Sequence, residues 1–238
     1  MAFPAATGLT TAYFSSASGV PSTTFASGPA VQSAEYAIYQ DIATGLMYFW
    51  NRLTAAWVAF GGGGGGTGAE TFISEVAVTG AVAASISFSS IAGTYRHLRL
   101  RCKVRDNSAL PADALQLNIN SDSTSGHYSW GGPINTNGTV TGLNTVGGTF
   151  MNVGDVAGGT QNAANFAVAE ITLPYYADTD NYKHVQGVYS RHDTGAGYII
   201  NGVRSGIWFA SSAITALSFT PGTGSFSIGS KISLYGVS

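Results

Sequence analysis

The residues with the clearest potential for chemistry are five basic side chains that alternate along one short stretch of the chain. This basic row consists of His97, Arg99, Arg101, Lys103 and Arg105, and it is interleaved with Leu98, Leu100, Cys102 and Val104. Alternation with a period of two predicts a β-strand that has its basic residues on one face and its apolar residues on the other. Neighbours on one face of a strand sit about 7 Å apart, so the row repels itself unless anions lie close by.

Two interpretations of the basic row fit the sequence. In the first, it is a solvated outer face whose charges pair with carboxylates on a neighbouring strand. In the second, it is a contact for an acidic partner, either another subunit or an anionic glycan. Nucleic acid is disfavoured, because the net charge is −2 and no aromatic residues interleave with the row to stack on bases.

The other reactive side chains do not form a recognisable catalytic pattern. The histidines at positions 97, 127, 184 and 192 lack a metal-binding spacing such as His-x-x-x-His. Cys102, the single cysteine, falls on the apolar side of its strand and is expected in the core rather than as a nucleophile. Because no region combines a nucleophile, a base and an orienting group, we expect no enzymatic activity, no metal site and no cofactor.

Two features between positions 120 and 130 have a functional and a structural interpretation. Residues 120–124, Asn-Ser-Asp-Ser-Thr, have the oxygen density of a calcium loop. They lack the glycine and the closing glutamate of an EF-hand, so an Asx turn is the better interpretation. Tyr128 and Trp130 could stack on sugar rings if exposed, or cap the fold if buried. They join the basic row as candidates for contact with a partner or a glycan.

The N-terminal quarter of the chain divides into three parts by composition. Residues 1–34 are small residues with scattered aromatics, which predicts an extended arm, either a flexible tail or an anchor that plugs pockets on a partner. The candidate anchoring residues are Phe3, Tyr13, Phe14 and Phe25. Residues 35–60 have apolar runs around turn signals, which predicts a small β-meander that must pack on something, most simply on copies of itself. Residues 61–68 form a glycine linker.

Residues 69–238 have the pattern of one short strand after another. Segments 85–89, 115–120 and 167–173 alternate between apolar and polar residues, and 213–220 is a further apolar run. Turn residues separate such segments, for example at 131–133, 135–138 and 147–148. No convincing helix of ten residues is present. The sequence therefore predicts an all-β protein whose C-terminal domain is a jelly-roll-like β-sandwich of eight to ten strands.

The composition points to assembly with other chains. Only 9% of the residues are charged, against roughly 25% in an ordinary soluble domain. Disorder does not follow from this, because 45% of the residues are hydrophobic. We expect other copies or another protein to cover much of the surface. We expect no membrane insertion, because no run of 18 apolar residues is present.

The segment from about 70 to 238 resembles a β-sandwich family of tailed bacteriophages, whose members are usually labelled tail fibre or minor structural proteins. Four stretches carry the likeness, in order along the chain: 86–98, 115–130, 171–183 and 206–236. The segment 35–60 also resembles short modules of phage fibre proteins. The family has no catalytic residues to carry over, so the resemblance adds no active site.

The resemblance implies a structural protein of the virion that is made in the cytoplasm of the bacterial host. One form is a homotrimeric tail fibre, whose N-terminus anchors to the tail and whose C-terminal knob binds the host surface. The alternative is a capsid decoration or head-fibre protein that stabilises the phage head. The implied partners are copies of the chain, other tail or capsid proteins, and a host cell-surface glycan.

Overall fold

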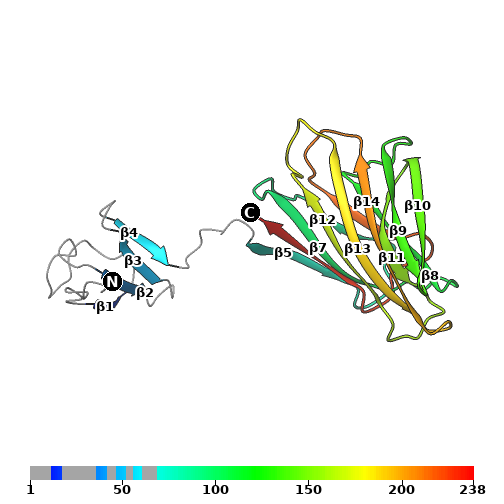
Figure 1. Ribbon diagram of the computed structural model, residues 1–238, viewed down its shortest axis with the longest axis horizontal. Helices are drawn as coiled ribbons and strands as arrows, with labels where there is room; N and C mark the ends of the chain where they lie inside the picture. Colours follow the sequence, from blue (N-terminus) through cyan, green and yellow to red (C-terminus); the bar gives the residue numbers. More distant parts are fainter. Residues whose placement is uncertain (1–11, 18–35, 42–46, 52–55, 61–68) are drawn as a thin grey trace, which may run out of the picture. The chain divides into compact units, whose positions relative to one another are not determined.

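The computed structural model describes residues 12–17, 36–41, 47–51, 56–60 and 69–238. The chain divides into two compact units, Met1–Gly65 and Gly66–Ser238 (Figure 1). All regular structure in the described residues is β-strand, so the predicted all-β class is confirmed. In that part of the chain, we find no helix with the length and apolar character needed to cross a membrane.

The first unit contains a four-stranded sheet. Its strands in chain order are β1 (Ala12–Ala17), β2 (Tyr36–Asp41), β3 (Met47–Asn51) and β4 (Ala56–Phe60). β2, β3 and β4 pair antiparallel, so the predicted meander is confirmed. β1 pairs parallel to β2, which the sequence did not indicate, because its Ala- and Ser-rich composition has no alternation. Its backbone hydrogen bonds add a strand where only an extended arm was expected.

The second unit is built from two antiparallel sheets. The larger sheet has the order β10, β9, β14, β13, β12, β7, β16, β5. These strands are β5 (Glu70–Ala77), β7 (His97–Val104), β9 (Tyr128–Thr136), β10 (Thr139–Gly148), β12 (Ala167–Pro174), β13 (Lys183–Asp193), β14 (Tyr198–Trp208) and β16 (Lys231–Val237). The smaller sheet has the order β11 (Met151–Ala157), β8 (Ala112–Ile119), β15 (Leu217–Pro221) and β6 (Ile86–Phe88).

The core lies between the two sheets, as in a β-sandwich. β11 of the small sheet contacts β12, β13 and β14 of the large one, and all its residues are buried. Alternating apolar residues fill the interface, for example Leu98 and Leu100 from β7 and Leu117 and Phe219 from the small sheet. The predicted sandwich is thus observed with eight and four strands, more than the eight to ten expected, and the jelly-roll connectivity is not confirmed.

Two of the predicted turns have different outcomes. Asn137 and Gly138 both have positive φ and join β9 to β10 in a two-residue hairpin, as the turn signal at 135–138 indicated. Gly131, Gly132 and Pro133 do not form a turn, because they lie within β9. The chain passes close to β14 at this point, where a Cβ on Gly132 would stand 2.1 Å from the Val203 carbonyl oxygen. The glycine is therefore needed for strand packing.

Candidate functional site

The basic row lies on β7, apart from Arg105, which follows the strand, and its predicted alternation is confirmed. Leu98, Leu100, Cys102 and Val104 are buried, and the basic residues between them are exposed or partly exposed. Burial raises the pKa of the Cys102 thiol, so the expected core position of this cysteine is confirmed as well. The basic side chains therefore lie on the outward face of the large sheet, away from the core.

Carboxylates on nearby strands neutralise the centre of the row. Glu70 of β5 forms ion pairs with Arg99 and, at 2.8 Å, with Arg101. Arg99 Nε also lies 3.1 Å from an oxygen of Glu170, which is on the adjacent strand β12. This arrangement matches the interpretation of the row as a solvated face with paired charges. Exposed pairs of this kind contribute about 0–1 kcal/mol each to stability.

The residues at the two ends of the basic row have other contacts. The ring of His97 lies edge to face with Tyr175, and its Nδ1 accepts a hydrogen bond from the Tyr175 amide. Lys103 is exposed, with its Nζ 4.3 Å from the centre of the Phe166 ring. Arg105 donates from Nη2 to the carbonyl oxygens of Gly159 and Gln161, at 3.0 Å each. Arg105 thus has an internal structural role, and its contact with a partner stays a prediction.

The prediction of Tyr128 as an exposed platform for a sugar is wrong. Its side chain is fully buried between the sheets, where its hydroxyl donates to the Asp122 carbonyl oxygen and accepts from the Ile119 amide. Burial raises its pKa to about 12. Trp130 is partly buried and packs against the core. Both rings face inward, because Tyr128 and Trp130 are two residues apart on β9 and so lie on the same side of the strand, toward the core. The interpretation of this pair as aromatics that cap the fold is therefore the correct one.

Asp122 organises the loop that follows β8. One carboxylate oxygen accepts from the Thr124 amide, which makes the expected Asx turn. The other accepts from His127 Nδ1 and from Trp208 Nε1, at 2.7 Å each. Donors thus occupy both oxygens, and the described residues contain no group of three or more acidic, histidine or cysteine side chains that could hold a metal. The loop ties β8, β9 and β14 together.

We expect the Asp122 contacts to make the stability depend on pH in the acid range. Burial opposes ionisation of this carboxyl, but hydrogen bonds from His127, Trp208 and Thr124 outweigh it and hold its pKa well below the usual range. A lowered pKa stabilises the fold above the unfolded value of about 3.9, and this stabilisation is lost as the pH falls further. Asp122→Asn should therefore flatten the decline of unfolding free energy below about pH 4 in urea titrations. Asp180→Asn, at an exposed loop position, should follow the wild type; equal slopes for all three proteins would contradict the role of Asp122.

A buried charged group lies between the sheets near β11, and it was not predicted from the sequence. Asp155 of β11 accepts from Arg191 Nε at 3.1 Å and lies 3.9 Å from Arg204 Nη2. Arg204 is almost fully buried, with its guanidinium 4.8 Å from the centre of the Tyr189 ring. Arg191 and Tyr189 alternate with outward residues along β13, and this alternation was the sequence signal that could have placed Arg191 on the inward side. The group joins β11 to β13 and β14.

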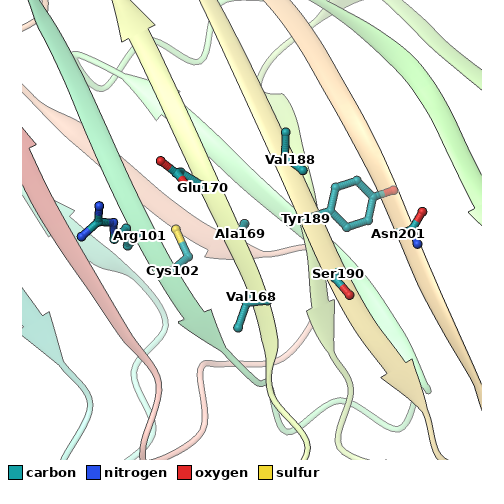
Figure 2. Close-up of a pocket in the computed structure, with 9 residues that line it drawn as sticks. All are labelled: Arg101, Cys102, Val168, Ala169, Glu170, Val188, Tyr189, Ser190 and Asn201. Atoms are coloured by element: carbon teal, nitrogen blue, oxygen red, sulfur yellow. The ribbon is translucent and has the colours of Figure 1, made fainter. Parts of the chain in front are cut away.

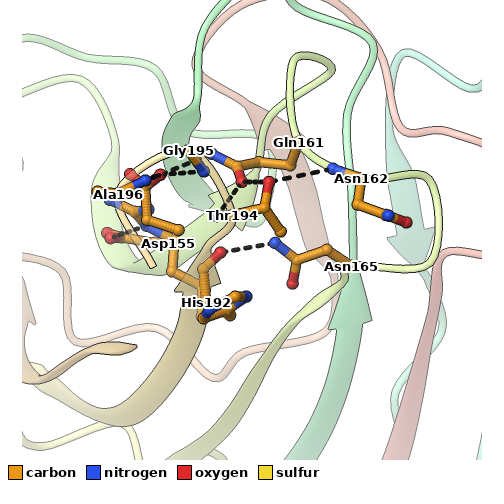
Figure 3. Close-up of polar contacts among 10 residues, drawn as sticks. Asp155, Gln161, Asn162, Asn165, His192, Thr194, Gly195 and Ala196 are labelled. Carbon is orange, nitrogen blue, oxygen red and sulfur yellow. Dashed lines mark hydrogen bonds and ion pairs between the residues drawn. The ribbon is translucent and has the colours of Figure 1, made fainter. Parts of the chain in front are cut away.

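Polar contacts also lock two loops at one end of the sandwich (Figure 3). The Gln161 side-chain oxygen accepts from the amide and the hydroxyl of Thr194, at 2.7 and 2.6 Å. Asn165 donates to the His192 carbonyl oxygen at 2.6 Å. Asp193 accepts from the amides of Gly195 and Ala196, which closes the turn between β13 and β14. These side chains hold the loops in place, and so their role is structural.

The outward face of the large sheet is hollowed in two adjoining places. The first hollow, of about 540 Å³, crosses β7, β12, β13 and β14 (Figure 2). Arg101 and Glu170 stand at one side of it, and the rest of its outward lining is formed by Val168, Val188, Ser190 and Asn201. The second, of about 400 Å³, shares Val188 and Asn201 and continues to β9 and β10. Together they make a shallow surface that is suited to contact with another molecule rather than to catalysis.

The predicted N-terminal anchors fall in the first unit. Tyr13 and Phe14 are residues of β1. Phe3 and Phe25 lie outside the described residues.

Comparison of the chain with protein-family models, with curated proteins and with solved structures found no match. The resemblance to phage proteins therefore stays a prediction from the sequence.

Proposed function

We propose that the chain is a non-enzymatic structural protein of a bacteriophage particle, most simply a trimeric tail fibre. The observation that carries the proposal is the modular build. A small sheet and a sandwich form separate compact units, and the division between them falls in the glycine run. An anchoring part, a spacer and a terminal knob are the parts that a fibre needs to attach to a particle and to present a binding surface.

The use of polar side chains supports a structural role. The side chains of Asp122, Asp155 and Gln161 accept hydrogen bonds from strands and loops of their own chain. Lys183 is fully buried and donates to the carbonyl oxygens of Asn181 and Ser211, which joins two loops at the end of the sandwich. Such internal bonding stiffens a domain that must survive outside the cell.

The basic row gives the proposed knob a region that could meet an acidic surface. Lys103 is exposed, and Arg101 is half-exposed at the border of the first hollow. Without Tyr128 the surface lacks the stacking pair that a neutral sugar would favour, so an anionic glycan or an acidic protein fits it better. The alternative role, capsid decoration, uses the same parts with the arm clamped between capsid subunits.

Copy number in purified particles tests the proposed function. Gel densitometry against the major capsid protein should give a few tens of chains per particle for a tail fibre. Several hundred copies per particle would contradict the tail-fibre role and support the role of a capsid decoration protein. Absence of the chain from gradient-purified particles would refute a structural role of either kind.

A further inference from the structure

The outward face of the large sheet is divided into a charged and an uncharged half. The charged half, on β5, β16, β7 and β12, presents Glu70, Glu75, Arg99, Arg101, Lys103, Glu170 and Lys231. On β13, β14, β9 and β10, the outward positions have no Asp, Glu, Lys or Arg, and their titratable side chains are His184 and His192 of β13. The charged residues of these strands, Lys183, Arg191, Asp193 and Arg204, take the inward positions of β13 and β14. We call the outward surface of these four strands the uncharged face.

Exposed β-branched side chains gather on the uncharged face. Val140 is 66% exposed, Val188 61%, Ile199 59% and Val203 41%. Val188 and Val203 are direct partners across β13 and β14, and both line the second hollow together with Val140. Single exposed valines are common on protein surfaces, but a contiguous group of them marks a contact site.

The edge of the sheet next to this face is unprotected. Among the described residues, β10 pairs only with β9, so its other side presents backbone amides and carbonyls with no strand partner in that part of the chain. The whole hairpin from 128 to 148 contains no charged residue. Natural edge strands are normally guarded by charges or proline. The opposite edge, β5, has this protection in Glu70 and Glu75.

We propose that the uncharged face binds the uncharged face of a second copy of this chain. Two such faces bring no carboxylate, lysine or arginine side chains together, so they meet without repulsion between such groups. The same lack of ionised groups leaves nothing on the face that would select a strongly charged partner. Four strands about 4.8 Å apart and about nine residues long cover on the order of 600 Å². That approaches the roughly 800 Å² that each partner buries in a standard interface. A contact between two identical faces has two-fold symmetry, so it joins copies in pairs and is not the contact that would close a trimer. The inference rests on the proposed virion role, which requires several copies in one particle, and not on the trimeric form of the fibre.

Light scattering of the full-length chain, with and without a charge on the face, tests this contact. The wild type should have the mass of an oligomer at micromolar concentration. Val188→Glu and Val203→Glu, each placing a carboxylate in the middle of the face, should shift the mass to that of a smaller species. Val82→Glu is the matched control, because Val82 is 51% exposed and lies outside the sheet, and it should keep the wild-type mass.

Circular dichroism establishes that the variants are folded. If a glutamate variant unfolds, the double variant Val188→Thr with Val203→Thr takes its place, because threonine keeps the β-branched shape of valine. This double variant should weaken the association between copies at least tenfold. A monomeric wild type, or folded variants that keep the wild-type mass, would overturn the contact. Neither result depends on the copy number in particles, so failure of the contact and failure of the virion role can be told apart.

Discussion

Replacing Asp155 with alanine is expected to lower the free energy of unfolding by about 3–5 kcal/mol. The carboxylate is buried and lies against Arg191 and Arg204, and burial raises its pKa even though both guanidinium groups oppose the rise. Without it, Arg204 keeps only carbonyl oxygens and the Tyr189 ring as partners among the described residues. The loss is large because the guanidinium stays in the core with its charge uncompensated. Urea unfolding at pH 7 measures it.

Glu170→Ala is the matched control for Asp155. Glu170 also pairs with an arginine, but its side chain is 50% exposed, and Arg99 keeps its second partner Glu70. We expect a loss of about 0–1 kcal/mol. A loss below about 1 kcal/mol for Asp155→Ala as well would mean that the buried group does not hold β11 against the large sheet.

Gly187→Ala is expected to cost about 1–3 kcal/mol of unfolding free energy. Gly187 lies on the inward side of β13, where a Cβ would stand 2.4 Å from the carbonyl oxygen of Val153 on β11. The obstacle is backbone, so a side chain cannot rotate away to make room, and the two sheets must move apart. Thermal unfolding followed by circular dichroism measures the loss.

Gly142→Ala provides the comparison for this substitution. Gly142 is also a strand residue of the large sheet, but a Cβ at this position would have no atom within 4 Å beyond its chain neighbours. Because alanine restricts the unfolded chain more than glycine does, we expect no loss and at most a small gain in stability. Equal effects of the two substitutions would mean that the sheets do not approach closely at Gly187.

Alternation along single strands was the most informative signal in the sequence. It placed Cys102 in the core and the basic row on the outside of β7, as observed. The same period in β13 aligns Val185, Gly187 and Tyr189 with Arg191, so it indicated that Arg191 lies on the inward side of the strand. That signal was missed because a charged residue is expected outside, and its partner Asp155 lies on another strand.

Contacts between distant segments could not be predicted in this way. Gly131–Pro133 has the composition of a turn, but pairing with both β10 and β14 keeps it within β9. Tyr128 faces inward because its hydroxyl finds partners in the loop after β8. The division of the large sheet into a charged and an uncharged half depends on the strand order, which joins strands far apart in the sequence.

The most direct test of the virion role is immunogold electron microscopy of purified particles, with antibodies against the C-terminal sandwich. If the chain is a tail fibre, the gold should lie at the tail, at a position beyond the attachment point of the fibre. Labelling spread evenly over the capsid would contradict the fibre and identify a decoration protein. Particles that remain unlabelled, although the antibody binds the isolated chain, would contradict the virion role altogether.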